Sequence, residues 1–154
     1  MSAPVGREGP RLSTLGMAML GLLVIEFLLG MALALFVTLP TGDPITVLAS
    51  SPILWVHILV GFLLIGITAN ALRWALRTAP RAARAVTALG LLSAIAAFLA
   101  GMAFTFGDPS PGASYAMSVG FAGILLDAGY LLARGTQLAA GLEGRVGAPD
   151  PGKV

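Results

Sequence analysis

The sequence predicts an all-α fold, an integral membrane four-helix bundle. Of the 154 residues, 57% are hydrophobic and only 10% are charged, whereas a soluble domain carries about 25% charged residues. Four apolar stretches each reach the roughly 20 residues that a helix needs to cross a bilayer. The basic residues lie at the ends of these stretches, all on one side of such a bundle. Membrane topology explains this distribution.

The chain divides into four spans with short connectors and two tails. The spans are expected at about 15–39, 53–76, 83–106 and 113–134. The first and third connectors each contain a turn-forming Gly-Asp-Pro, and the second is basic. The first span is too long for the apolar region of a signal peptide, so we expect it to be retained. Residues 15–140 therefore form one membrane domain, and the Gly- and Pro-rich segments 1–14 and 141–154 are expected to be mobile tails.

Positive charge predicts the orientation of the bundle. All nine basic residues fall on one side of it: Arg7, Arg11, Arg73, Arg77, Arg81, Arg84, Arg134, Arg145 and Lys153. The positive-inside rule then places both termini and the second connector in the cytoplasm. We expect a multi-pass protein of the bacterial cytoplasmic (inner) membrane. Its expected partner is the lipid bilayer, and no binding to nucleic acid is expected.

The two halves of the chain resemble each other. The segment Phe27–Ala32 recurs as Phe98–Ala103, and Val60-Gly61-Phe62 recurs as Val119-Gly120-Phe121. Both helical hairpins are expected to start and end in the cytoplasm. They would then be parallel repeats related by a pseudo-two-fold axis along the membrane normal.

The single histidine, His57, lies within the second apolar span. An ionisable group in hydrocarbon is costly and marks a function by default, and imidazole is a common ligand of heme iron and transition metals. The repeat places Met117 nearly opposite, one residue out of register. Gly61 and Gly120, one turn deeper, are expected to leave room for a flat ligand. These four residues predict heme b held by His57 and Met117.

Two further residues belong to this predicted site. Trp55 and Tyr115 lie near the same end of the bundle and could hydrogen-bond the heme propionates. The alternative is structural: a neutral His57 bonded to a carbonyl or hydroxyl of another helix, and Met117 as an apolar core filler.

Two acids, Glu26 and Asp127, lie inside the apolar spans. Counting from the helix ends places both near the bilayer midplane, roughly 13 Å deeper than His57 at the helical rise. No lysine or arginine lies at that depth, so we expect both carboxyls to be neutral. They could carry protons below a redox or substrate site, or they could be structural acids bonded to Thr68, to Tyr130 or to each other.

The second span, with Trp55-Val56-His57 followed by Gly61-Phe62, resembles the histidine-bearing helices of four-helix transmembrane cytochromes b and of heme A synthase halves. The chain is also similar to small four-span bacterial proteins that share a His-x-x-x-Gly helix and a Met-x-x-Gly-Phe helix, here Met117–Phe121. The resemblance implies His57 as a heme ligand. Those cytochromes carry several helix histidines, so one chain here cannot provide two histidine ligands. His/Met ligation, a heme shared across a dimer, or no heme at all are the remaining possibilities.

Three functions are compatible with these features. The first is a small heme-binding or redox-associated protein, such as a respiratory-complex subunit. The second is a non-catalytic accessory subunit of a larger membrane complex. The third is a small proton-coupled transporter that uses Glu26 and Asp127 and works as a homodimer. An electron carrier or accessory subunit is favoured over an enzyme, since the sequence has no phosphate loop, no nucleophile–base pair and no cysteine.

Overall fold

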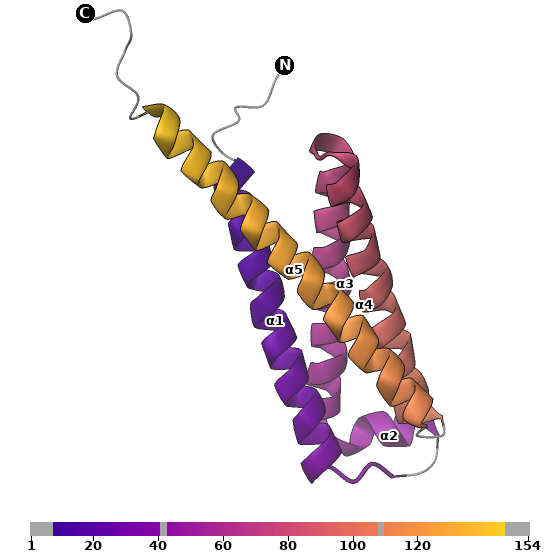
Figure 1. Ribbon diagram of the computed structural model, residues 1–154. Coiled ribbons are helices and arrows are strands. Elements are labelled where there is room, and N and C mark those ends of the chain that lie inside the picture. The colour runs from indigo at the N-terminus through magenta and orange to yellow at the C-terminus, as the bar shows by residue number, and fades with distance from the viewer. Residues whose placement is uncertain (1–7, 41–42, 108–109, 147–154) are drawn as a thin grey trace, which may run out of the picture.

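The computed structural model describes residues 8–40, 43–107 and 110–146, and within them the chain forms five helices. They are α1 (Glu8–Phe36), α2 (Pro44–Ser50), α3 (Pro52–Thr78), α4 (Arg81–Phe106) and α5 (Pro111–Val146). The four long helices alternate in direction, and the short α2 lies crosswise at one end of them (Figure 1). The predicted all-α class is confirmed.

The four long helices are the four predicted membrane spans. Their candidate spanning segments are Arg11–Phe36, Pro52–Thr78, Arg81–Phe106 and Pro111–Gly141. Large apolar side chains cover the outside of the bundle; Leu28, Leu92 and Leu126 are each at least 60% exposed. A soluble monomer rarely exposes so much continuous apolar surface. The chain is therefore a multi-pass membrane protein whose exterior contacts lipid.

Prolines and one acid set the helix boundaries. Pro44, Pro52 and Pro111 stand at the first helical positions, where a missing N–H costs nothing. Asp43 caps α2, because its carboxylate accepts the amides of Ile45 and Thr46 at 3.0 and 3.1 Å. The Thr46 hydroxyl also donates to this carboxylate at 2.7 Å, and these hydrogen bonds hold the pKa of Asp43 below its usual range. The sequence analysis predicted a connector without a helix between the first two spans, whereas the structure has the short helix α2 there.

Two helices are longer than the predicted spans. α1 already begins at Glu8 and α5 continues to Val146, so helix extends into both segments expected as tails. The remaining parts of those predicted tails, residues 1–7 and 147–154, lie outside the described residues.

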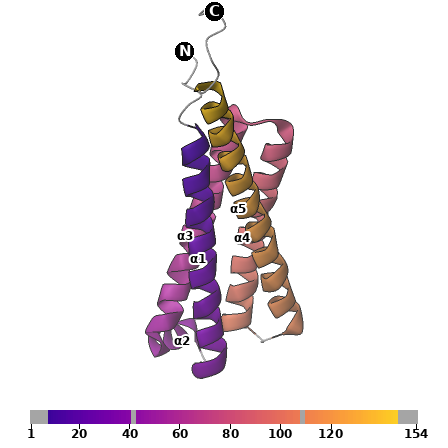
Figure 2. The same ribbon diagram turned by 60° about the vertical axis from the view of Figure 1, so that its left-hand side comes forward.

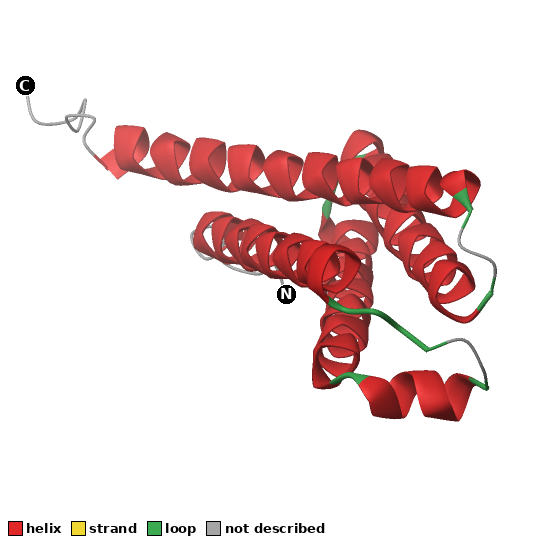
Figure 3. Ribbon diagram, turned by 90° about the horizontal axis from the view of Figure 1, so that it is seen from below, coloured by secondary structure: helices red, strands yellow, loops and turns green. Residues whose placement is uncertain are grey.

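The long helices form a ring in which each packs against two neighbours. α1 contacts α3 and α5, and α4 contacts α3 and α5. The diagonal pairs, α1 with α4 and α3 with α5, face each other across the bundle axis (Figures 2 and 3). We call the end that carries α2 the α2 end. The opposite end, which carries Arg11, Arg77, Arg81 and Arg134, is the arginine end.

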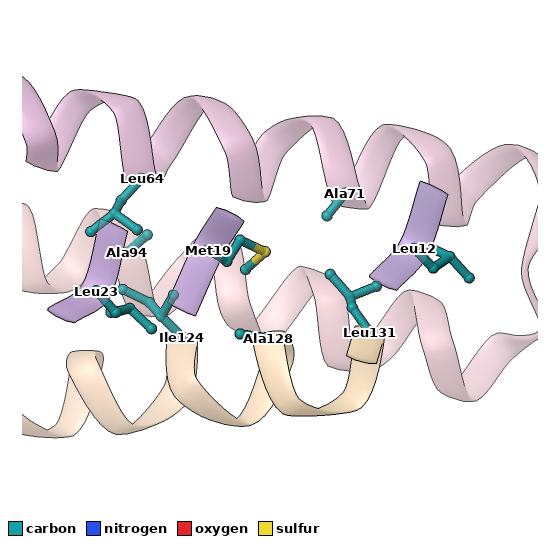
Figure 4. Packing of buried hydrophobic residues seen from close by; sticks show 9 residues of the cluster. All are labelled: Leu12, Met19, Leu23, Leu64, Ala71, Ala94, Ile124, Ala128 and Leu131. Carbon is teal, nitrogen blue, oxygen red and sulfur yellow. The ribbon is translucent and has the colours of Figure 1, made fainter. Parts of the chain in front are cut away.

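The core is built in layers, with one residue from each long helix in every layer. In one layer, four buried apolar residues meet, and Figure 4 shows them together. This leucine layer consists of Leu23, Leu64, Ala94 and Ile124. Neighbouring layers follow at steps of three or four residues along each helix, the spacing that keeps side chains on one helix face.

Candidate functional site

The candidate site is a histidine–carboxylate pair between α1 and α3. His57 Nδ1 lies 3.2 Å from Glu26 Oε2, within the distance of an ion pair. The N–H direction misses the carboxylate oxygen, so the contact is not an aligned hydrogen bond. Both atoms are buried and have no other partner among the described residues. The imidazole and the carboxyl group therefore depend on each other for polar contact.

The second imidazole nitrogen is in a different situation. Side-chain exposure of His57 is 25%, and Nε2 is neither buried nor hydrogen-bonded within the described part of the chain. Nδ1 therefore faces the carboxylate while Nε2 stays available. This is the arrangement in which a metal-ligating histidine is held, because the carboxylate fixes the ring orientation and its tautomer.

The expected depth of Glu26 relative to His57 is wrong. Glu26 precedes the end of α1 at Phe36 by ten residues, or about 15 Å, whereas His57 follows the start of α3 at Pro52 by only five residues, or about 7 Å. Counting from helix ends assumed that the ends are level. In the structure α1 projects past the start of α3 (Figure 1), and this offset brings the two side chains together.

Two glycines on the other diagonal lie beside His57 and Met117. A Cβ atom built on Gly30 would have His57 Cε1 at 3.5 Å, and one built on Gly101 would have the Met117 sulfur at 3.5 Å. Apart from the nearby residues of the same helix, no other atom of the described residues lies within 4 Å of either Cβ position. We call these four residues the histidine layer: Gly30, His57, Gly101 and Met117.

The next layer toward the arginine end is closed. A Cβ on Gly61 would lie 3.1 Å from the Phe98 ring, and a Cβ on Gly120 would lie 2.7 Å from Ala97 Cβ. These glycines let helices approach each other and do not leave the room for a flat ligand that the sequence predicted. We call this closed layer the glutamate layer: Glu26, Gly61, Ala97 and Gly120.

Two aromatic pairs fix the helices in register at this level. The rings of Phe27 and Phe121 join α1 to α5 with centroids 6.0 Å apart, and those of Phe62 and Phe98 join α3 to α4 at 4.6 Å. Each phenylalanine follows a glutamate-layer residue directly in sequence. Because all four helices are registered here, the residues one turn away, His57 and Met117 included, also share a level.

The two predicted aromatic site residues lie on the outside. Trp55 is 55% exposed and Tyr115 is 72% exposed. Tyr115 borders a shallow groove on the surface of α4 and α5, together with Leu92, Ala96 and Val119. Both side chains are therefore exposed where they meet lipid or the interface with water.

Asp127 stands apart from Glu26. It is fully buried, and both of its carboxyl oxygens lack a hydrogen-bond partner among the described residues. The carboxyl group fits against Gly90 of α4, where a Cβ atom would overlap it. Asp127 is seven residues beyond Gly120 on α5, and Gly120 shares the glutamate layer with Glu26. Asp127 therefore lies two layers nearer the arginine end than Glu26. The expected structural role, in which the acids bond to Thr68, to Tyr130 or to each other, is therefore wrong for Asp127, because its carboxyl oxygens bond to none of these groups.

The contact between Gly90 and Asp127 can be tested by changing each of the two residues. Gly90→Ala should destabilise the bundle by about 1–3 kcal/mol, because the added methyl overlaps the carboxyl group and forces α4 and α5 apart. Combining it with Asp127→Ala should recover most of this loss. Unfolding in a denaturing detergent, followed by circular dichroism, measures both. Equal destabilisation of the single and the double variant would contradict the fitted contact.

Within the described residues, no group of three or more His, Cys, Asp or Glu side chains could hold a metal ion alone. Comparison of the chain with protein-family models, with curated proteins and with solved structures found no match.

Proposed function

We propose that this chain is a small heme-binding, redox-associated membrane protein, with His57 and Met117 as the ligands of heme b. The observation that carries the proposal is the 3.2 Å approach of His57 Nδ1 to Glu26 Oε2, which leaves Nε2 available. A carboxylate behind the ring orients a ligating imidazole and raises its basicity. Glu26 thus acts as the positioning residue for His57.

The histidine layer supports the second ligand. Met117 belongs to the same layer as His57, and each of these two side chains faces a glycine there, Gly30 or Gly101, at 3.5 Å from its Cβ position. A His/Met ligand set raises the reduction potential of heme iron relative to two histidines. Heme, when bound, supplies one-electron transfer, which the side chains of this chain cannot provide.

The orientation and the repeat form part of the proposal. With the arginine end in the cytoplasm, as the positive-inside rule requires, the histidine layer faces the extracytoplasmic side of a bacterial inner membrane. Three pairs of contacts support the two-fold repeat. Gly30–His57 corresponds to Gly101–Met117, Glu26–Gly61 corresponds to Ala97–Gly120, and Phe27–Phe121 corresponds to Phe98–Phe62.

The absorption spectrum of protein purified in detergent from cells with ample heme tests this function. We expect a Soret band that His57→Ala abolishes. Met117→Leu should shift the band and lower the midpoint potential, whereas Met31→Leu, a change at an exposed methionine of α1, should leave both unchanged. A colourless wild-type protein, or a His57→Ala variant as coloured as the wild type, would overturn the proposal.

A further inference from the structure

Asp127 is the second unusual ionisable group of the bundle, and heme ligation does not use it. Its layer, the aspartate layer, contains one residue from each long helix, and all four are buried: Met19, Thr68, Gly90 and Asp127. The Thr68 hydroxyl donates within its own helix, to the carbonyls of Leu64 and Ile65. The carboxyl group therefore occupies a site where no described side chain compensates it.

The charged form of Asp127 has no counter-ion nearby. On α5, Tyr130 packs against the cluster of Ala75, Ala79 and Ala83, and Arg134 bonds Gln137 at 3.3 Å. Neither α1, α3 nor α4 presents a titratable group in the aspartate layer or in the layers next to it. An isolated carboxylate is very costly in an apolar interior, so the stable form in this position is the acid with its proton.

The layers on the two sides of Asp127 differ in polarity. Toward the α2 end, the leucine layer fills the axis with three branched side chains and one alanine. Toward the arginine end, the next positions are mostly small residues with a single leucine in each step, and all are buried: Gly16, Ala71, Thr87 and Leu131, then Leu12, Ala75, Ala83 and Gly135. The small residues permit close packing, since a Cβ on Gly16 would lie 2.8 Å from the Leu132 side chain. The arginine side differs from the leucine layer in polarity, because it contains the Thr87 hydroxyl next to the aspartate layer.

The leucine layer separates two protonatable sites. The glutamate layer and the aspartate layer are seven residues apart on every long helix, which is a distance of about 10 Å at the helical rise. Glu26 and His57 lie on the α2 side of this barrier, and Asp127 lies on the arginine side. The two sites are arranged in series across one apolar layer.

We propose that Asp127 is a proton-binding site that exchanges its proton with the arginine end, and that the leucine layer isolates it from the Glu26–His57 pair. The ligand is a proton taken from water at that end. This inference does not depend on heme binding. It requires only the burial of Asp127, its unpartnered oxygens and the difference in polarity between the apolar leucine layer and the Thr87 side.

Infrared spectroscopy tests the bound proton directly. At neutral pH the full-length protein in lipid should show the carbonyl band of a protonated carboxylic acid, and Asp127→Asn should remove it. Glu26→Gln should leave this component in place. Absence of the Asp127-dependent band would overturn the proposal, whether or not the protein binds heme.

Proton flux into vesicles tests the barrier. Wild-type protein should be almost impermeable under an imposed potassium diffusion potential, with an internal pH dye as the readout. Ile124→Asn, which places an amide in the leucine layer, should raise the flux severalfold, and adding Asp127→Asn should return it to the wild-type level. The matched control is Leu125→Asn, at the adjacent exposed position of α5.

Two outcomes of the flux measurement would contradict the proposal. One is equal flux through Ile124→Asn and Leu125→Asn, and the other is flux through Ile124→Asn that does not depend on Asp127. Circular dichroism establishes that each variant is folded. If Ile124→Asn does not fold, Leu64→Ala opens the same layer with a smaller change, and the same dependence on Asp127 is expected.

Discussion

At the proposed heme site, replacing Glu26 with alanine is expected to weaken the binding of added heme by about 10- to 100-fold, the usual effect of removing the carboxylate behind a ligating histidine. Glu26 is the only described group within polar contact of His57 Nδ1. Without it the ring can rotate about its side-chain torsions, and the proton can move between the two nitrogens. Heme titration of the purified variant measures the affinity, and Glu26→Gln, which keeps an acceptor oxygen, should have a smaller effect.

The same variant has a readout that does not require heme. His57 is the only histidine of the chain, so its imidazole nitrogens give unambiguous NMR signals. The wild-type ring should hold one tautomer, with the proton on Nδ1 beside Glu26, and Glu26→Ala should give a mixture of tautomers. Asp127→Asn is the matched control, because it removes the other intramembrane acid and should change neither signal. Identical spectra for wild type and Glu26→Ala would contradict a positioning role for Glu26.

The fold was largely predictable because a membrane limits the choices. In hydrocarbon every backbone polar group must be bonded internally, so a long apolar stretch can only become a helix. Length and composition therefore located all four spans. α2 was missed because its seven residues are too few to show a helical period, and its start depends on the cap at Asp43.

The partner of His57 could not be found by counting depth along each helix separately. The signal lay in a complementary spacing that the sequence analysis did not use. Glu26 and Gly30 are four residues apart on α1, and His57 and Gly61 are four residues apart on the antiparallel α3. The acid therefore faces one glycine and the imidazole faces the other. Local sequence cannot reveal which helix lies opposite, because that depends on how far α1 projects past α3.

The glycines also show why the sequence analysis wrongly predicted space for heme at two positions. Small residues in membrane helices either leave space or permit close packing, and only the opposite helix decides between these outcomes. Gly61 and Gly120 face Phe98 and Ala97 at close range, whereas Gly30 has only His57 beside it. The heme room predicted at the first two positions is therefore occupied by the neighbouring helix.

Gly120→Ala is expected to be among the most destabilising small substitutions in the bundle. Its methyl group would lie 2.7 Å from Ala97 Cβ and 2.7 Å from the backbone carbonyl oxygen of Ser93. A backbone atom cannot rotate away as a side chain can, so α4 and α5 must separate along their interface. We expect a loss of about 1–3 kcal/mol in the free energy of unfolding.

Gly129→Ala on the same helix is the matched control. No atom lies within 4 Å of its Cβ position, so the methyl meets open space, and the higher helix propensity of alanine should stabilise the helix by up to about 1 kcal/mol. The two variants carry the same chemical change and should move the unfolding midpoint in denaturing detergent in opposite directions.

Adding Ala97→Gly to Gly120→Ala should restore only part of the loss, since the Ser93 carbonyl remains. A separation of α4 from α5 would also move Met117 away from Gly101, so Gly120→Ala should disturb any spectrum that depends on the Met117 sulfur, and Gly129→Ala should not.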